Sequence, residues 1–218
     1  MAGADSTTET GRVDRRKVRT RRALIEAAKR LITEGRSSTA SIQQITDTAD
    51  IGFGSFYNHF SSKEELFHAA TAAVLEEWAQ LIEDATKDVG DPAERFATSF
   101  RISARLAWTH PALADVLNRF GLDLLELQDG LGPRAMRDIQ DAVAAGRFTV
   151  SSLPLALSTV GGALLGFLRL KTSHPALVDP SAVEDLARQM LQMLGISPEE
   201  AVRICAAPLP ELPTTTSR

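Results

Sequence analysis

Residues 41–66 read SIQQITDTADIGFGSFYNHFSSKEEL, and they predict two short helices, a tight turn near Asp50–Gly52 and the start of a third helix. The first helix begins at Ser41 with the S-x-x-Q spacing of a capping box, in which two side chains satisfy backbone N–H groups at a helix start. Ser62 and Glu65 repeat this spacing before the third helix. Two short helices joined by a turn of three or four residues are a common way to place side chains in the major groove of DNA.

Basic residues are concentrated just before this stretch. Residues 12–30 contain nine lysines and arginines against two acidic residues, a net charge of +7, whereas residues 69–218 contain 13 basic and 19 acidic residues, a net charge of −6. A basic end on an acidic body indicates that a polyanion binds at that end only. The alternative is that the basic arm is a solubilising tail.

The composition of the chain is that of an ordinary globular protein. Its 218 residues are 44% hydrophobic and 24% charged, and its one cysteine, Cys205, excludes an intrachain disulfide. The N-terminus lacks the apolar segment of a signal peptide, so we expect a cytoplasmic protein. The four histidines do not have metal-ligand spacing, and no nucleotide-binding or nucleophile motif is present. We therefore expect no enzymatic activity, metal or cofactor.

Apolar residues recur at helical spacing along most of the chain, and no stretch alternates as a strand would. We predict an all-α protein of about nine helices, the first from about Arg16 to Glu34 and the fourth from Ser62 to about Asp88. The predicted parts are a disordered arm over residues 1–14, a helix-turn-helix domain over 15–67, a C-terminal helical domain over 68–196 and a tail over 197–218.

The segment from Leu153 to Thr172 is strongly apolar, and its first 16 residues carry no charge. That uncharged run is shorter than the roughly 20 residues needed to span a bilayer, and it contains Pro154 and several small residues. We therefore predict a helix buried on nearly all sides, which in an all-helical protein often means a dimer interface, rather than a membrane span. Gly162 and Gly166 would let a partner backbone approach closely.

Residues 20–67 resemble the N-terminal DNA-binding domain of the tetracycline-repressor (TetR) family of bacterial transcriptional regulators. The resemblance is carried by the amphipathic first helix, by ITDTA at 45–49 and by GSFYNHFSSKEEL at 54–66, which is similar to the family pattern G-T-L-Y-x-Y-F-x-S-K-E-x-L at most positions. Asp50 stands where the family usually has a turn glycine, although aspartate tolerates a left-handed backbone better than most residues. Gly52 replaces a common Ser or Thr cap, at a cost of a few tenths of a kcal/mol.

The resemblance implies roles for individual side chains. Ile45, Ala49, Phe56 and Phe60 would hold the two short helices together. The family contacts phosphate at the positions of Tyr57, His59 and Lys63, whose phenol, imidazole and ammonium groups can each donate to a phosphate oxygen. Gly54 would be small because two helices meet there or because the backbone meets DNA. The predicted DNA-binding residues are Arg16, Arg19, Ser41, Gln43, Gln44, Phe53, Gly54, Ser55, Tyr57, Asn58, His59 and Lys63.

The residues that read bases are less sharply specified. Gln43 and Gln44 can face the groove, where glutamine pairs bidentately with adenine, although we expect one of them to be only a solvated surface residue. Ser55 and Asn58 are the candidates in the second helix. Phe53 is expected either to contact a thymine methyl group or to fold back onto the first helix.

The resemblance also implies a C-terminal domain that binds a small-molecule effector and forms a homodimer on a palindromic operator. We expect a repressor that a mostly apolar effector releases from DNA by a population shift. The candidate effector-binding residues are Trp78, Phe96, Phe100, Arg101, Trp108, His110, Phe120, Asp123 and Phe167. The alternatives to a repressor are an activator and a non-specific DNA-binding protein, with a small-molecule binder or an enzyme less favoured.

The dimer is expected to form through a four-helix interface. Its two helices in each subunit would be those over 153–172 and 181–194. The candidate interface residues are Leu157, Val160, Leu164, Phe167, Leu168, Leu186, Met190 and Met193. The alternative, for these residues as for the effector-binding aromatics, is that many of them belong to the core of a single subunit.

Overall fold

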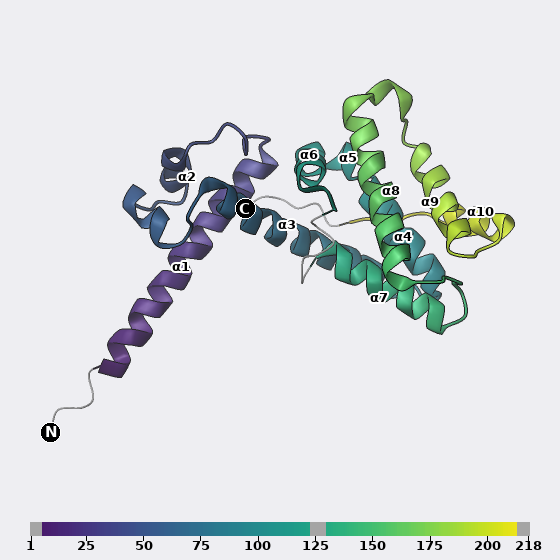
Figure 1. Cartoon of the computed structure of the whole chain (residues 1–218), viewed down its shortest axis with the longest axis horizontal. Coiled ribbons are helices and arrows are strands. Elements are labelled where there is room, and N and C mark those ends of the chain that lie inside the picture. The colour runs from purple at the N-terminus through teal and green to yellow at the C-terminus, as the bar shows by residue number, and fades with distance from the viewer. Residues whose placement is uncertain (1–5, 123–129, 213–218) are drawn as a thin grey trace. The chain divides into compact units, whose positions relative to one another are not determined.

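The computed structural model describes residues 6–122 and 130–212, and within these ranges every regular element is a helix (Figure 1). Ten α-helices and two 3-10 helices are present among these residues. The chain divides into an N-terminal unit, Met1–Val74, and a C-terminal unit, Leu75–Arg218. Helix α3, Lys63–Thr86, belongs to both units because it is continuous across their boundary.

The N-terminal unit contains α1 (Ser6–Thr33), α2 (Ile42–Thr48), the 3-10 helix η1 (Phe53–Asn58) and the start of α3. Helix α1 begins ten residues earlier than predicted and includes residues 6–14 of the expected disordered arm. No proline interrupts this stretch, and Gly11 lowers the helix propensity without ending the helix. At the other end Gly35 has a φ of 69° and stops α1, as predicted.

A small core holds the N-terminal unit together. Ile45 and Phe56 are fully buried, Phe60 is 2% exposed, and apolar residues of α1 such as Leu24 and Ile32 pack in the same unit. Burial of side chains of this size contributes about 1.5–3 kcal/mol each. The predicted structural roles of Ile45, Phe56 and Phe60 are confirmed, whereas Ala49 is only half-buried.

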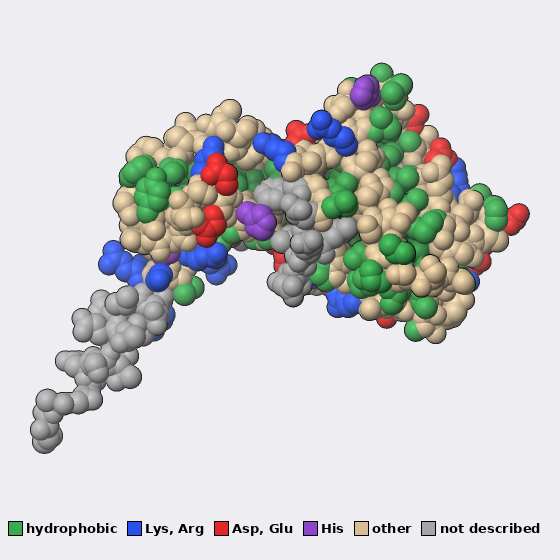
Figure 2. Space-filling view, in the orientation of Figure 1, with side chains coloured by type: hydrophobic (Ala, Val, Ile, Leu, Met, Phe, Trp, Pro, Cys, Tyr) green, Lys and Arg blue, Asp and Glu red, His purple; other side chains and the backbone are tan. Residues whose placement is uncertain are grey.

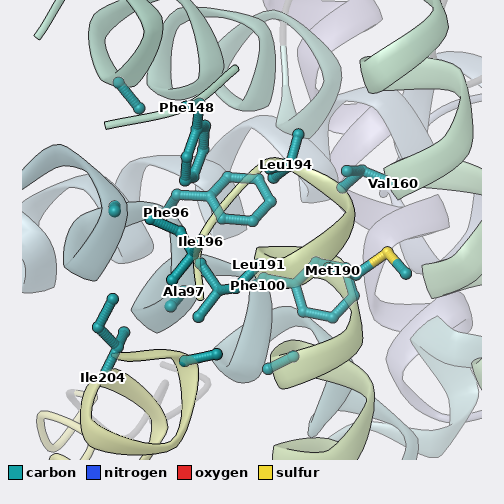
Figure 3. Close-up of a cluster of buried hydrophobic side chains, with 14 of the residues drawn as sticks. Phe96, Ala97, Phe100, Phe148, Val160, Met190, Leu191, Leu194, Ile196 and Ile204 are labelled. Carbon is teal, nitrogen blue, oxygen red and sulfur yellow. The ribbon is translucent and has the colours of Figure 1, made fainter. Parts of the chain in front are cut away.

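The C-terminal unit continues with seven more α-helices and one 3-10 helix among the described residues. They are α4 (Pro92–Ala104), α5 (Leu106–Thr109), α6 (Pro111–Phe120), α7 (Leu131–Ala144), α8 (Leu153–Ser173), η3 (Pro175–Leu177), α9 (Ala182–Met193) and α10 (Pro198–Ala206). Their main core is built around Phe96 and Phe100 of α4, to which α8, α9 and α10 contribute (Figure 3). Phe148 meets Phe96 edge to face, with the ring centroids 5.3 Å apart.

Helix α10 corrects the predicted tail over 197–218. Ser197 caps this helix by accepting a hydrogen bond from the backbone N of Glu200, and Pro198 occupies the first turn. Ile204 and Cys205 are each 3% exposed and belong to the main core. The helix has only nine residues, which is too few for its apolar spacing to stand out from the sequence.

Within the single chain, helix α8 is buried on one side only. It has 21 residues, which is long and apolar enough to cross a bilayer by length and composition, and only 28% of its most apolar window is buried. Val160, Phe167 and Leu168 face the interior, whereas Leu155 is 66% and Leu170 is 41% exposed. One side of α8 therefore packs on the C-terminal unit and the other side has no partner within the described part of this chain.

Candidate nucleic-acid interface and effector cavity

Helix α2 and the turn after it form as the sequence predicts. Ser41 Oγ accepts from the backbone N of Gln44 at 3.2 Å, and the Gln44 side-chain oxygen accepts from the backbone N of Ser41 at 2.9 Å, so both halves of the capping box are present. Asp50 has a φ of 54°, the left-handed conformation expected of it. These local bonds fix the direction in which the chain enters η1.

The second of the two predicted short helices is η1. It is a 3-10 helix of six residues, and His59 ends it with a backbone hydrogen bond to Phe56 O. Gly52, at its start, supplies no side-chain cap, as the sequence implied. Without that cap the tighter i to i+3 bonds, such as Ser55 N to Gly52 O at 2.8 Å, satisfy the first turn.

Two aromatic side chains project from η1. Phe53 is 46% and Tyr57 is 56% exposed, and their rings meet edge to face with centroids 6.1 Å apart. Burial against the first helix would hide the Phe53 ring, so its exposure favours the alternative in which this ring faces DNA. A Cβ atom on Gly54 would have no protein atom within 4 Å, so contact with another helix does not explain why this residue is small.

Three predicted DNA contacts are occupied within the protein. The Lys63 ammonium donates to the carbonyl oxygens of Ser38 at 3.3 Å and Ala40 at 3.1 Å, which ties the loop before α2 to α3. The Gln44 oxygen belongs to the α2 cap, and the Gln43 amide donates to Asp47 at 2.7 Å. The ammonium reaches these carbonyls because α3 begins beside the loop, a proximity that 22 intervening residues conceal in the sequence.

The start of α3 also differs from the prediction in one detail. Ser62 Oγ accepts from the backbone N of Glu65 at 3.1 Å, as the S-x-x-E spacing implies. The Glu65 carboxylate, however, accepts from the backbone N and the hydroxyl of Ser61, each at 2.6 Å, rather than from Ser62. Ser61 offers two donors in one place, and these bonds lower the pKa of Glu65.

Five of the predicted DNA-binding residues come together around one concave surface of the N-terminal unit. Arg16 and Arg19 of α1 line it together with Ser55, Asn58 and His59. Lys17, which belongs to the predicted basic end, and the turn residues 50–52 also line it. Figure 2 shows Lys and Arg side chains gathered on this unit beside the grey N-terminal residues. A basic concavity beside an exposed aromatic pair suits a nucleic-acid backbone.

His59 has an unusual environment in this concavity. Its Nδ1 atom is buried and has no hydrogen-bond partner among the described residues. Burial lowers the pKa of His59, and the positive charges of Lys17 and Arg21 lower it further. The imidazole of His59 is therefore neutral near pH 7. The guanidinium of Arg21 lies 4.9 Å from the centre of the Phe60 ring, within the range of a cation–π contact.

The C-terminal unit contains a cavity of about 320 Å³ between α3, α4, α7 and α8. Phe96 and Phe100, two of the residues predicted to bind the effector, form part of its wall, and Ile82, Leu157 and Leu164 add to its apolar lining. Ten of the lining residues carry hydroxyl or charged groups. They are Thr86, Ser99, Ser103, Glu83, Lys87, Arg95, Arg134, Arg137, Asp138 and Asp141.

The other predicted effector-binding residues lie elsewhere. Arg101 is 4% exposed and donates to the Ala207 carbonyl at 2.9 Å and to Glu184 at 3.2 Å. Trp78 packs edge to face on His110, with the ring centroids 4.8 Å apart. Trp108 packs on Phe167 with the rings tilted by 47° and the centroids 5.9 Å apart. None of these four rings lines the cavity. Helical spacing in the sequence predicts that such rings are buried, but it does not show which neighbours they contact. Asp123 and the side chain of Phe120 lie outside the described part of the chain.

Ion pairs surround the cavity. Arg95 donates to Asp138 at 3.1 Å and to Asp141 at 2.6 Å, while Arg134 is bonded to Glu76 and Glu83 of α3. Burial raises the pKa of Asp138, although Arg95 opposes this shift. The cavity therefore joins apolar walls, suited to a ring, with paired charges that can bind hydroxyl groups.

The predicted dimer residues lie mostly within one subunit. Val160, Phe167, Leu168 and Met190 are buried in the single chain. Leu157, Leu164 and Leu186 are half-buried against the same cores. Met193 alone of the eight predicted residues is exposed, at 40%. The exposed side of α8 instead presents Leu155, Ser158, Thr159, Gly166 and Leu170.

Two known sequence families match the chain. The family described as "Bacterial regulatory proteins, tetR family" matches residues 24–70, and "Tetracyclin repressor-like, C-terminal domain" matches residues 91–207, more than half of the chain. The chain belongs to the TetR family. As a TetR-family protein it is a ligand-responsive regulator of transcription, and the resemblance carried by residues 20–67 is confirmed.

The chain is also similar to solved structures. RolR in complex with resorcinol is 31% identical, with a TM-score of 0.74 over 92% of this chain and 100% of that one. RolR without ligand is 29% identical, with a TM-score of 0.68 over 88% and 99%. FadR from Bacillus subtilis in complex with stearoyl-CoA is 17% identical, with a TM-score of 0.56 over 80% and 98%, and shows the shared fold alone. A comparison with curated proteins found no match.

Proposed function

We propose that this TetR-family protein is a cytoplasmic repressor that binds a palindromic operator as a dimer and leaves it when a small effector fills the cavity in the C-terminal unit. The observation that carries this proposal is the pairing of an exposed basic concavity in one unit with an apolar cavity in the other. Neither feature alone calls for a regulator, but together they supply a DNA-reading surface and a sensor.

On DNA, we assign Arg16, Arg19, Tyr57 and His59 to phosphate contacts. The exposed positions Phe53, Ser55 and Asn58 would meet base edges, with Gly54 allowing the backbone to approach closely. Lys63, Ser41 and Gln44 act indirectly in this proposal, because their bonds set the position of α2. The two reading heads of the dimer should be about 34–36 Å apart, or a multiple of that distance, to reach successive major grooves.

The effector is proposed to be a small aromatic molecule that carries hydroxyl groups. A cavity of about 320 Å³ lies at the small end of the range of ligand pockets and is far too small for a molecule such as stearoyl-CoA. The rings of Phe96 and Phe100 would contact the aromatic face, and Asp138 and Arg134 would bind hydroxyl groups. Resorcinol, the ligand in the RolR complex at 31% identity, has this chemistry.

The dimer is proposed to form through the exposed side of α8, with Met193 of α9 as a further exposed apolar residue. Figure 2 shows hydrophobic side chains spread over the face on which α8 lies. A Cβ atom added to Gly162 or Gly166 would have no protein atom within 4 Å, so a second backbone has room to approach there. A second copy of the chain explains the exposed apolar side of α8 better than a bilayer does, because the polar residues Ser158 and Thr159 lie on that side.

A mobility-shift assay tests the proposal. The DNA flanking the protein's own gene should bind at least about 10³-fold more tightly than random DNA, the lower limit for specific regulators. Resorcinol should then release the specific complex. Equal affinity for both DNAs would contradict a specific regulator, whereas specific binding that no hydroxylated aromatic affects would contradict only the effector class.

A further inference from the structure

Arg134, in the first turns of α7, makes an extensive set of hydrogen bonds to α3. Its Nη1 and Nη2 atoms donate to the two carboxylate oxygens of Glu76, each at 2.7 Å, and its Nε donates to Glu83 at 2.8 Å. Nη2 also donates to the Gln80 side-chain oxygen at 3.1 Å. Positions 76, 80 and 83 lie on one face of α3, so a single guanidinium holds two turns of that helix.

This group of contacts, which we call the Arg134 clamp (Arg134 with Glu76, Gln80 and Glu83), depends strongly on geometry. The Arg134 side chain is 17% exposed, and its planar fork meets Glu76 in the bidentate arrangement that requires both oxygens in place. The backbone N of Gly130 adds a bond to the same carboxylate at 2.7 Å. These bonds lower the pKa of Glu76 and raise that of Arg134, so both groups stay charged.

The Arg134 clamp is also part of the cavity wall. Arg134 and Glu83 both line the cavity, and Arg137, which lies 3.5 Å from Glu83, lines it as well. A hydroxyl group that enters the cavity and bonds to Arg134 or Glu83 competes with the bond between them. Ligand binding therefore acts on the contact that fixes α3 against α7.

The same helix is held at its other end by a second cation. Helix α3 begins at Lys63, whose ammonium binds the carbonyls of Ser38 and Ala40, directly before the α2 cap at Ser41. Helix α3 is continuous between these two contacts, so it connects the Arg134 clamp to the loop that precedes α2.

We propose that Arg134 is the positioning residue of the regulatory switch: it holds α3 in the orientation that binds the operator, and the effector releases the operator by breaking the bond between Arg134 and Glu83. This inference rests on the proposed function and adds to it the residue through which the effector acts. It predicts that loss of the clamp reproduces the effect of the ligand.

Arg134→Met tests the inference, because methionine keeps an apolar stem and removes every donor. Without any ligand, we expect this variant to bind the operator about fivefold more weakly or worse, the lower bound of common allosteric couplings. Arg203→Met is the matched control. Arg203 is 61% exposed and pairs only with surface glutamates among the described residues, so its operator affinity should not change. The slope of affinity against salt should stay the same in both variants, because no phosphate contact is lost.

Glu83→Gln is a second test that leaves the bidentate pair with Glu76 intact. We expect Glu83→Gln to lower operator affinity by less than Arg134→Met does. The double variant should bind the operator no more weakly than Arg134→Met alone. Adding resorcinol should lower operator affinity in the wild type and have little further effect on Arg134→Met. A folded Arg134→Met protein with wild-type operator affinity would overturn the inference, and if that variant does not fold, wild-type affinity in Glu83→Gln would do so. Absence of specific binding in the wild type would instead overturn the proposed function.

Discussion

Gly54 lies in the exposed helix η1, where no protein atom would touch an added methyl group. We expect Gly54→Ala to change the free energy of unfolding by less than about 1 kcal/mol, because the site has room and alanine also restricts the unfolded chain. On DNA the same methyl group would meet the backbone or a base, and operator affinity should fall by about tenfold, which corresponds to about 1.4 kcal/mol. Thermal unfolding and fluorescence anisotropy with operator DNA measure the two effects.

Gly35→Ala is the control for this substitution. Gly35 also has open space around it, but its φ of 69° is unfavourable for alanine. This variant should lose about 1–2 kcal/mol of stability and keep the operator contacts. If Gly54→Ala bound the operator as tightly as the wild type, close approach of the backbone to DNA at η1 would be wrong.

His59 should make operator binding dependent on pH. In the free protein its pKa is lowered, so the ring is neutral near pH 7, whereas a nearby phosphate would favour the charged ring and raise the pKa. Binding then takes up a proton. Affinity should rise as the pH falls from about 8, with a slope of at most about one proton, and level off below the lowered pKa of the free protein.

The measurement is operator affinity at several pH values and constant salt. His59→Gln should abolish most of the pH dependence. His174→Gln, which removes an exposed histidine of the C-terminal unit, should keep it. If operator affinity of His59→Gln depended on pH as it does in the wild type, the proposed contact between His59 and a phosphate would be wrong.

Substitutions in helix α10 test whether the residues after 197 belong to the core. Ile204 is 3% exposed within the main cluster, whereas Val202 in the same helix is 54% exposed. Ile204→Ala should lower the free energy of unfolding by about 2–5 kcal/mol. Val202→Ala should stay within about 0.5 kcal/mol of the wild type. Urea unfolding compares them, and equal stability of the two variants would restore the tail predicted from the sequence.

Helix ends and turns were the elements most readily predicted. The Ser41 capping box, the left-handed Asp50 and the end of α1 at Gly35 are each local features, because each depends only on residues within about four positions of it. The length of η1 and the shifted bonds of Glu65 did not follow, because several local hydrogen-bond patterns compete there with similar energies. Helix α10 was missed although Ser197 and Pro198 form a recognisable start signal.

The assembly of two chains depends on the exposed side of α8. Leu155 is 66% exposed on this side, so Leu155→Lys should have little effect on the stability of one subunit. A buried lysine in a dimer interface would be costly, and we expect this variant to sediment as a monomer at micromolar concentration and to bind the operator weakly. Leu177→Lys is the control, since Leu177 is 72% exposed in η3. A dimeric Leu155→Lys protein would place the interface elsewhere.

The helical character, the DNA-reading motif and the basic end could be read from the sequence, because caps, turns and charge runs depend on neighbours along the chain. The cavity could not, since Trp78, Phe96 and Phe167 all occupy buried positions on helices, and of these three only Phe96 lines it. Arg134 and Glu76 are 58 positions apart, and nothing local marks them as partners. Which side of α8 stays open was likewise decided by packing, because burial depends on how helices distant in sequence meet.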